Sequence, residues 1–304
     1  MIDHDIIVQS ARVKALEKTF LTRQQLEKVA AAPTLQAALG ELDSTPYRFG
    51  QALASPADIC LFFDSVRANL MAQAKELLPV RLYQWYRFRY DIGTLRLIFN
   101  AGVESLLPKG SPFTLVSEGN LGLALKEKKV IREPEVWQIL SRRVISAQGP
   151  AAAAESYQEF FRLWVNLVAN WKSEFLSRYQ SLEIDFFNLS LFLQKEETGM
   201  ALERKNLVAG GQVNPGIYLE PSRLWKAFPT YYSGISPPVT SQTWEKEKVK
   251  TAMRLLREAR RVAAGVEVLV AYLLAREIEI TGLQKLLLGK AAGLPPEMLG
   301  EWIY

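Results

Sequence analysis

Acidic side chains are the main candidates for acid–base chemistry in this sequence. Two pairs lie close together, Glu183 with Asp185 and Glu277 with Glu279. Two carboxyl groups can act as general acid and general base, as they do in glycoside hydrolysis. Each pair nevertheless lies in a segment of helical apolar spacing, where exposed or interface charge is the commoner explanation. A carboxylate-based enzyme therefore stays open as an alternative, and it requires two acids that converge in one pocket.

Other common catalytic systems lack the residues they need. His4 is the only histidine and Cys60 the only cysteine, so Ser–His–Asp and Cys–His systems have no internal base and a zinc site has too few ligands. The Gly210-Gly211 pair is not followed by the Lys-Ser/Thr of a phosphate-binding loop, and it is interpreted as a connector. We expect no catalytic residue, no cofactor and no metal site.

Composition indicates a folded protein with mild basicity. Hydrophobic residues make up 49% and charged residues 23% of 304 residues, and the net charge is +5. Acids interleave with bases, as at 254–261, so no nucleic-acid partner is expected. The start of the chain does not look like a signal peptide, and no stretch reaches the roughly 18 apolar residues of a membrane span. The lone cysteine suits a reducing compartment.

Elements that position the acids are predicted to be helices. Apolar residues recur at three and four residues in the long windows 57–78, 155–193 and 245–288. The few Val/Ile runs lack the alternation of exposed strands. Breakers at 108–112, 147–150, 210–216 and 233–238 divide the chain into comparable blocks. The sequence therefore predicts an all-α fold.

An internal repeat places one acid in each block. Asp91, Asp185 and Glu279 are each followed four residues later by Leu and by an apolar pair at positions seven and eight. Asp185 lies 94 residues after Asp91, and Glu279 lies 94 residues after Asp185. The sequence therefore predicts three related helical modules, at 1–110, 111–210 and 211–304. We refer to these three carboxyl groups as the repeat acids.

Helical geometry puts positions zero, four, seven and eight on one stripe, so each copy presents an apolar face with one carboxylate. Such an acid can cap a helix or pair across a module boundary. Three equivalent modules suggest an arrangement about a pseudo-threefold axis, which can enclose a central hollow.

Arginine and aromatic residues interleave at 81–89. This segment could lie near lipid headgroups, or it could be an amphipathic helix whose arginines extend from an ordinary core. Our candidates for contacts between modules or with partners are the acids and two arginines from this segment: Asp91, Asp185, Glu277, Glu279, Arg87 and Arg89.

The whole chain resembles the C subunit of V/A-type ATPases and ATP synthases, which is the equivalent of the d subunit of the eukaryotic vacuolar enzyme. The strongest part is the segment 271–280, AYLLAREIEI, which is similar to the family signature AY-x-x-A-[KR]-E-x-E-[IV], and the GLPPE at 293–297. The start is similar too, at 11–17, 21–22 and 45–47. The family often places Asn before the repeat Leu, and here only Asn188 keeps it, with Thr94 and Gly282 in the other copies.

This resemblance implies a funnel-shaped, all-helical subunit of three modules without an active site. It implies that the subunit sits on the membrane rotor ring, receives the central axle in its cavity and transmits torque during proton- or sodium-coupled ATP synthesis or hydrolysis. The location implied is peripheral, on the cytoplasmic side, with membrane contact through the ring. A soluble helical-repeat adaptor without ATPase partners is the alternative, and it has no reason to carry the C-terminal signature.

Overall fold

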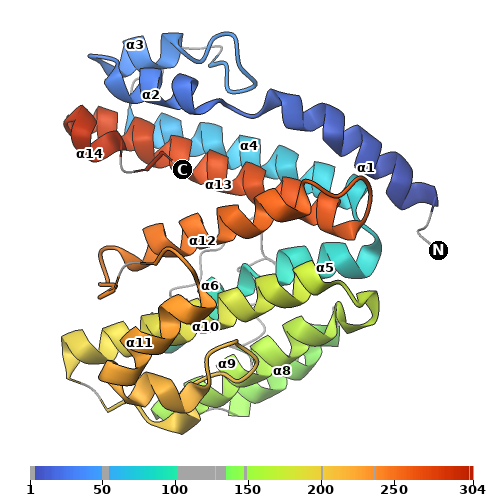
Figure 1. Ribbon diagram of the computed structural model, residues 1–304, viewed down its shortest axis with the longest axis vertical. Coiled ribbons are helices and arrows are strands. Elements are labelled where there is room, and N and C mark those ends of the chain that lie inside the picture. The colour runs from blue at the N-terminus through green and yellow to red at the C-terminus, as the bar shows by residue number, and fades with distance from the viewer. Residues whose placement is uncertain are drawn as a thin grey trace. The chain divides into compact units, whose positions relative to one another are not determined.

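The computed structural model describes residues 4–49, 55–101, 127, 135–146, 149–199, 201–235, 237–300 and 302–303 (Figure 1). Every regular element within these ranges is a helix, and none of them contains a strand. The prediction of an all-α fold is confirmed. The breaker at 108–112 and the predicted boundary between residues 110 and 111 lie outside the described residues.

The α-helices have the following bounds: α1 His4–Leu16, α2 Arg23–Ala31, α3 Leu35–Gly40, α4 Pro56–Leu77, α5 Val80–Phe88, α6 Asp91–Ala101, α8 Glu135–Ser146, α9 Gly149–Asn166, α10 Glu174–Thr198, α11 Pro221–Tyr231, α12 Trp244–Ala259, α13 Val266–Ala291 and α14 Pro296–Gly300. Short 3₁₀ helices are η1 Glu17–Thr19, η3 Ala169–Trp171, η4 Arg204–Asn206 and η5 Pro215–Leu219. The two repeat acids Asp185 and Glu279 lie on α10 and α13, and Asp91 begins α6.

Local chemistry explains where several helices begin and end. Thr22 and Ser55 each accept a hydrogen bond from the third residue of α2 and α4, in reciprocal capping boxes. Pro56, as the first residue of α4, needs no amide hydrogen there. Gly199 ends α10 with φ 68°, a left-handed conformation that glycine adopts without a steric penalty.

Two of the long helical windows each contain two helices. In the window 155–193, α9 ends at Asn166 and α10 begins at Glu174. Lys172 has φ 48°, which a continuous helix does not allow, and the next residue, Ser173, caps α10. In the window 245–288, Gly265 with φ 154° separates α12 from α13. Apolar periodicity runs through both interruptions, so it does not reveal them.

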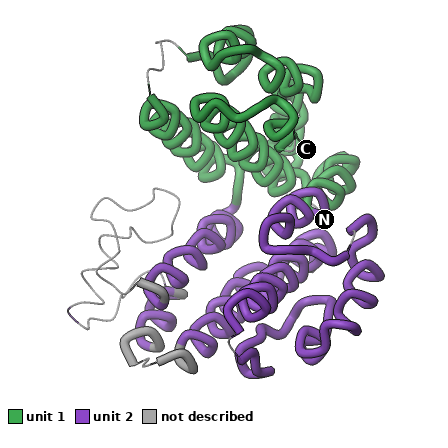
Figure 2. The backbone as a smooth tube through the Cα atoms, turned by 90° about the vertical axis from the view of Figure 1, so that its left-hand side faces the viewer, with its two compact units in different colours: residues 1–78, 252–304 green, residues 79–251 purple. Residues whose placement is uncertain are grey.

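The chain forms two compact units (Figure 2). Unit 1 contains residues 1–78 and 252–304, and unit 2 contains residues 79–251. Unit 1 thus joins the two ends of the chain. The three-module division inferred from the repeat is a different partition and stays a prediction.

Helix α13 forms the centre of unit 1. It packs against α4 and also contacts α1, α2, α3 and α14. Its residues 268–276 are all buried, so this stretch is covered on every side. A helix covered on every side must be apolar all round, which the run VLVAYLLA satisfies. The helix therefore holds Arg276 and Glu279 in a packed interior.

Unit 2 has a core rich in aromatic residues around α10. The indole rings of Trp85 and Trp164 stack with centroids 5.3 Å apart, and Phe88 lies 4.6 Å from Phe160. A second cluster packs α10 against η5 and α11, with Phe186 and other buried side chains at its centre. Aromatic rings bury large areas and lock their neighbours into few rotamers, so α10 is held firmly on both sides.

No helix in the described ranges combines the length and the apolar character that crossing a membrane requires.

Candidate functional site

The Asp185 carboxylate on α10 is buried and accepts hydrogen bonds from four donor groups. The hydroxyls of Tyr232 and Tyr218 donate to it at 2.5 and 2.9 Å. The backbone amides of Gln212 and Val213 donate at 2.6 and 3.2 Å. These donors come from the loop after α10, from η5 and from the end of α11. One side chain therefore ties the polypeptide of 212–232 to the central helix of unit 2.

Burial and hydrogen bonding act on Asp185 in opposite directions. Burial raises its pKa to about 6, although hydrogen bonds from Tyr232, Val213, Tyr218 and Gln212 favour the ionised form. Burial, together with the carboxylate itself, raises the pKa of Tyr218 and Tyr232, so both phenols stay protonated and act as donors. With its oxygens occupied by internal donors, Asp185 is poorly placed to take a proton from a substrate.

The connector at Gly210-Gly211 passes directly over Asp185. A Cβ atom at Gly211 would lie 1.9 Å from the carboxylate oxygen, so only glycine allows this approach. The loop is also tied by Asn188, whose side chain donates to the carbonyl of Val208 and accepts from its amide, both at 2.8 Å. The glycines let the backbone come close enough to donate.

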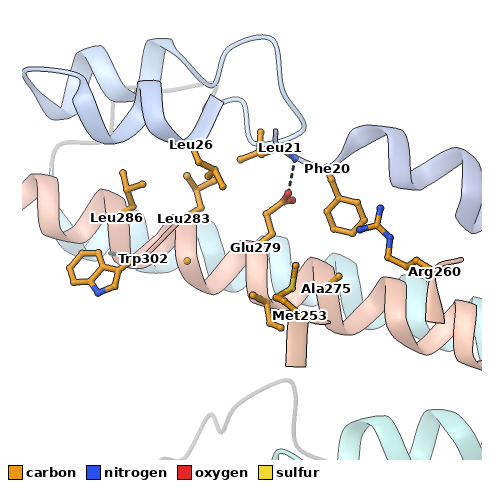
Figure 3. Close-up of a pocket in the computed structure, with 12 residues that line it drawn as sticks. Phe20, Leu21, Leu26, Met253, Arg260, Ala275, Glu279, Leu283, Leu286 and Trp302 are labelled. Carbon is orange, nitrogen blue, oxygen red and sulfur yellow. Dashed lines mark hydrogen bonds between the residues drawn. The ribbon is translucent and has the colours of Figure 1, made fainter. Parts of the chain in front are cut away.

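Glu279 on α13 forms a second buried carboxylate contact, in unit 1. It accepts a hydrogen bond from the amide of Leu21 at 2.6 Å (Figure 3). The hydroxyl of Tyr47 and the guanidinium of Arg276 also donate to it, both at 2.6 Å. Arg276 also donates to the hydroxyl of Thr19 at 2.6 Å. The side chains of Arg276 and Glu279 are each 8% exposed, so this ion pair is almost withdrawn from water. The pair fixes the N-terminal segment onto α13.

A cavity of about 110 Å³ lies beside Glu279, lined mainly by apolar side chains (Figure 3). Arg260, which also lines it, pairs with Glu17 at 2.7 Å. Among the described residues Glu279 is the one acid that lines this cavity, and its neighbour Glu277 does not line it. Acid–base catalysis by a pair of carboxylates has no geometric basis here.

Asp91, the first residue of α6, forms the third buried carboxylate contact. The indole nitrogen of Trp137 on α8 donates to it at 2.9 Å, and both side chains are fully buried. The contact joins two helices of unit 2 that are 46 residues apart in the sequence.

The three contacts share one pattern, in which each repeat acid accepts a hydrogen bond from an aromatic side chain. The donors, which we call the repeat aromatics, are themselves spaced regularly: Trp137 lies 90 residues after Tyr47, and Tyr232 lies 95 residues after Trp137. Asp91 binds an aromatic 46 residues further on, and Asp185 binds one 47 residues further on. Glu279 binds Tyr47, which lies 232 residues earlier in the sequence. The pattern is therefore cyclic.

The remaining predicted residues lie apart from these contacts. Glu277 is half-buried on α13, two residues before Glu279 and thus on a different face of the helix. Arg87 lies 5.7 Å from the ring centre of Tyr83. Arg89 follows α5 and donates to the carbonyl of Tyr86 and the hydroxyl of Tyr90, both at 3.1 Å. The structure does not gather all six candidates in one place.

The acid pair Glu183 and Asp185 does not converge either. Glu183 pairs with Lys248 at 2.6 Å and accepts from the hydroxyl of Tyr179 at 2.8 Å, whereas Asp185 faces a different set of donors. No cluster of three or more His, Cys, Asp or Glu side chains suited to a metal ion occurs in the part of the chain that the structure describes.

The donors to the repeat acids were not identified from the sequence. Trp137, Tyr218 and Tyr232 were not singled out, and Tyr47 and Arg276 were noted only within segments that resemble the family. The one signal that could have found three of them is the regular spacing of Tyr47, Trp137 and Tyr232, which parallels the spacing of the acids.

Comparison with known proteins gives the same family as the sequence resemblance. The family model described as ATP synthase (C/AC39) subunit matches residues 154–301. Proteins named as the C subunit of A-type ATP synthase are similar over 97% of this chain. The proteins from Thermococcus gammatolerans and Thermococcus kodakarensis are 22% identical to this chain, and the protein from Pyrococcus abyssi is 23% identical. The similarity covers 88%, 89% and 89% of the length of these proteins, in that order. The predicted resemblance is confirmed, since both comparisons find this chain similar to C/AC39 subunits of ATP synthases.

Proposed function

We propose that this chain is a non-catalytic rotor subunit of a V/A-type ATPase that links the central axle to the membrane ring and transmits torque. The observation that carries the proposal is the similarity to the C subunit of A-type ATP synthase over 97% of the chain. A helical-repeat adaptor would have no reason to resemble one ATPase subunit over almost its entire length. The carboxylate enzyme is disfavoured because neither acid pair shares a cavity.

Torque transmission requires a body that does not yield under load, and the buried contacts support such a role. Each repeat acid joins segments far apart in the sequence, at separations of 46, 47 and 232 residues. Hydrogen bonds to charged groups are stronger and more directional than neutral ones. Close-packed helices deform little, and the contacts add fixed links between them.

Burial separates the candidate residues into two groups. Asp91 and Asp185 are fully buried, and Glu279 is occupied by internal donors, so we assign them to contacts between repeated segments of the chain. Arg87 and Glu277 are partly exposed, and we propose them as positions for partner contacts. The regular spacing of acids and aromatics supports three modules at 1–110, 111–210 and 211–304.

The partners we propose are the axle subunits and the membrane ring, on the cytoplasmic side, with membrane contact through the ring. Affinity purification of the tagged full chain from native membranes tests this. Recovery of axle and ring subunits together with ATPase activity is the expected result. A matched preparation tagged on an unrelated soluble protein shows the background. Purification of the chain without any ATPase subunit would refute the proposal.

A second experiment tests whether the chain connects the axle to the ring or only binds to the ATPase. In membranes that lack this chain, we expect the catalytic headpiece to detach on washing, while the ring stays in the membrane. Re-addition of the chain should restore ATP-driven ion pumping. Full pumping without the chain would exclude a torque-transmitting role.

A further inference from the structure

Unit 2 contains a second cavity whose lining differs sharply from that beside Glu279. It measures about 70 Å³ and lies between side chains of α6, α9, α10 and α12 and of Arg89 just after α5. Aromatic and apolar residues form most of its wall, and the charged residues that line it in the described part of the chain are Arg89, Arg96, Glu183 and Lys248. Among these four residues, cations outnumber carboxylates by three to one. Aromatic walls lower the local polarity and strengthen the field of the charges.

Arg96 is the informative residue of this cavity. Its guanidinium donates to the hydroxyl of Ser190 at 2.9 Å and lies 4.8 Å from the ring centre of Phe187. No carboxylate lies within ion-pairing distance of it among the described residues. Burial lowers the pKa of Arg96, which means that the surroundings do not compensate its charge fully. Glu183 offsets only part of the cost of burying this charge, and because no carboxylate pairs with Arg96 directly, an anion here would be favourable.

The one acid in the cavity is already engaged. Glu183 pairs with Lys248 at 2.6 Å and accepts from Tyr179 at 2.8 Å. Arg89 donates to Tyr86 and Tyr90 and lies 4.5 Å from the ring centre of Tyr90. The Lys248 and Glu183 side chains remain 26% and 21% exposed, so the cavity can be reached from solvent.

We propose that this cavity binds a tetrahedral oxyanion of charge −2, such as phosphate, with Arg96 and Lys248 as its principal ligands. A water molecule needs about 10–15 Å³ of such cavity volume, so 70 Å³ accommodates about five water-sized groups, the number of heavy atoms in phosphate. A dianion suits a lining whose described cations outnumber its carboxylates by three to one. Arginine presents a planar set of donors that suits phosphate oxygens, and lysine adds a mobile point charge.

Isothermal titration of the full-length chain with inorganic phosphate tests the proposal. Saturable binding at one site is expected. Arg96→Gln should weaken binding by about tenfold or more, because it removes a charged donor. Glu183→Gln should strengthen binding about fivefold or more, because it removes the negative charge and releases Lys248. The control is Arg223→Gln, which alters an exposed arginine of the same unit paired with Glu220 and should leave binding unchanged.

The two variants are expected to change the affinity for phosphate in opposite directions, which separates ligand binding from a purely structural role of Arg96. A structural Arg96 would give destabilised variants but no gain of affinity from Glu183→Gln. If glycerol phosphate competes with inorganic phosphate, the site is assigned to a phosphate ester. If inorganic phosphate binds and glycerol phosphate does not compete, the site is assigned to the free ion. Absence of saturable phosphate binding by the unmodified chain would overturn the proposal, as would equal affinities of the unmodified chain and a folded Arg96→Gln variant.

Discussion

Removal of the Tyr232 hydroxyl should destabilise the protein by an amount that depends on pH. This hydroxyl donates to the buried Asp185 at 2.5 Å. A hydrogen bond to an ionised group contributes about 1.5–3 kcal/mol, whereas one between neutral groups contributes about 0.5–1.5 kcal/mol. Burial raises the pKa of Asp185 to about 6, so its carboxyl group is ionised near pH 8 and mostly protonated near pH 5. We expect Tyr232→Phe to lower the free energy of unfolding by about 2 kcal/mol near pH 8 and by about 1 kcal/mol near pH 5.

The direction of this pH dependence follows from proton binding. The folded-state pKa of Asp185 lies above the value of about 3.9 for an unfolded aspartate, so the folded state binds more protons between these values. The contribution of Asp185 to stability is therefore greatest below about pH 4 and declines as the pH rises to about 6. The Tyr232 bond limits this decline because it favours the ionised carboxylate, so its loss should raise the pKa of Asp185 further.

Urea denaturation of the full chain, followed by circular dichroism at both pH values, measures this effect. The control is Tyr231→Phe, because the neighbouring Tyr231 is 45% exposed and its replacement should cost less than about 0.5 kcal/mol. In an Asp185→Asn background the pH dependence of the Tyr232→Phe cost should disappear. An equal cost of Tyr232→Phe near pH 5 and near pH 8, or a cost no larger than that of Tyr231→Phe, would refute the reasoning.

Three further substitutions test the other buried contacts by the same urea measurement. Gly211→Ala forces a Cβ atom against the Asp185 carboxylate and should lower the free energy of unfolding by at least about 2 kcal/mol. Its control is Gly93→Ala, at an exposed helical position with open space, which should raise the free energy of unfolding by about 0.5–1 kcal/mol. Glu279→Gln leaves the buried Arg276 without a counter-charge and should lower the free energy of unfolding by about 3–5 kcal/mol. Its control is Glu277→Gln, on another face of the helix, which should lower it by less than about 1 kcal/mol. Trp137→Phe removes the indole that donates to the buried Asp91 and should lower the free energy of unfolding by about 2 kcal/mol. A loss smaller than that caused by Glu277→Gln would show that the hydrogen bond from Trp137 to Asp91 is dispensable.

The sequence predicted a helical fold because apolar residues recur along it at helical spacing. Thr22 and Ser55 act as capping residues within three residues of their partners, so their roles depend on local sequence alone. The interruption at Lys172 was missed because a lysine in a left-handed conformation has no signature of its own. Tertiary packing determines that turn, and apolar spacing continues on both sides of it.

The acids were predicted as a repeated stripe, but their surroundings were not. Asp185 appears in the sequence as one acid within an amphipathic pattern, and nothing nearby shows that it is fully buried. Its strongest donor, Tyr232, lies 47 residues away. A contact at that separation depends on how the intervening loop folds, which composition and periodicity do not determine. The paired acids that suggested catalysis proved to have separate donors for the same reason.

The partner of Glu279 shows how the repeat closes. In the first two copies an acid binds the aromatic of the next copy, and the third acid binds Tyr47 of the first. Unit 1 is built accordingly, since it unites residues 1–78 with residues 252–304. Tyr47 in the N-terminal segment therefore supplies the aromatic donor of the third repeat acid. Because each of the three repeat acids accepts from an aromatic side chain, the loss of any one contact should weaken a connection between parts of the chain that lie far apart in the sequence.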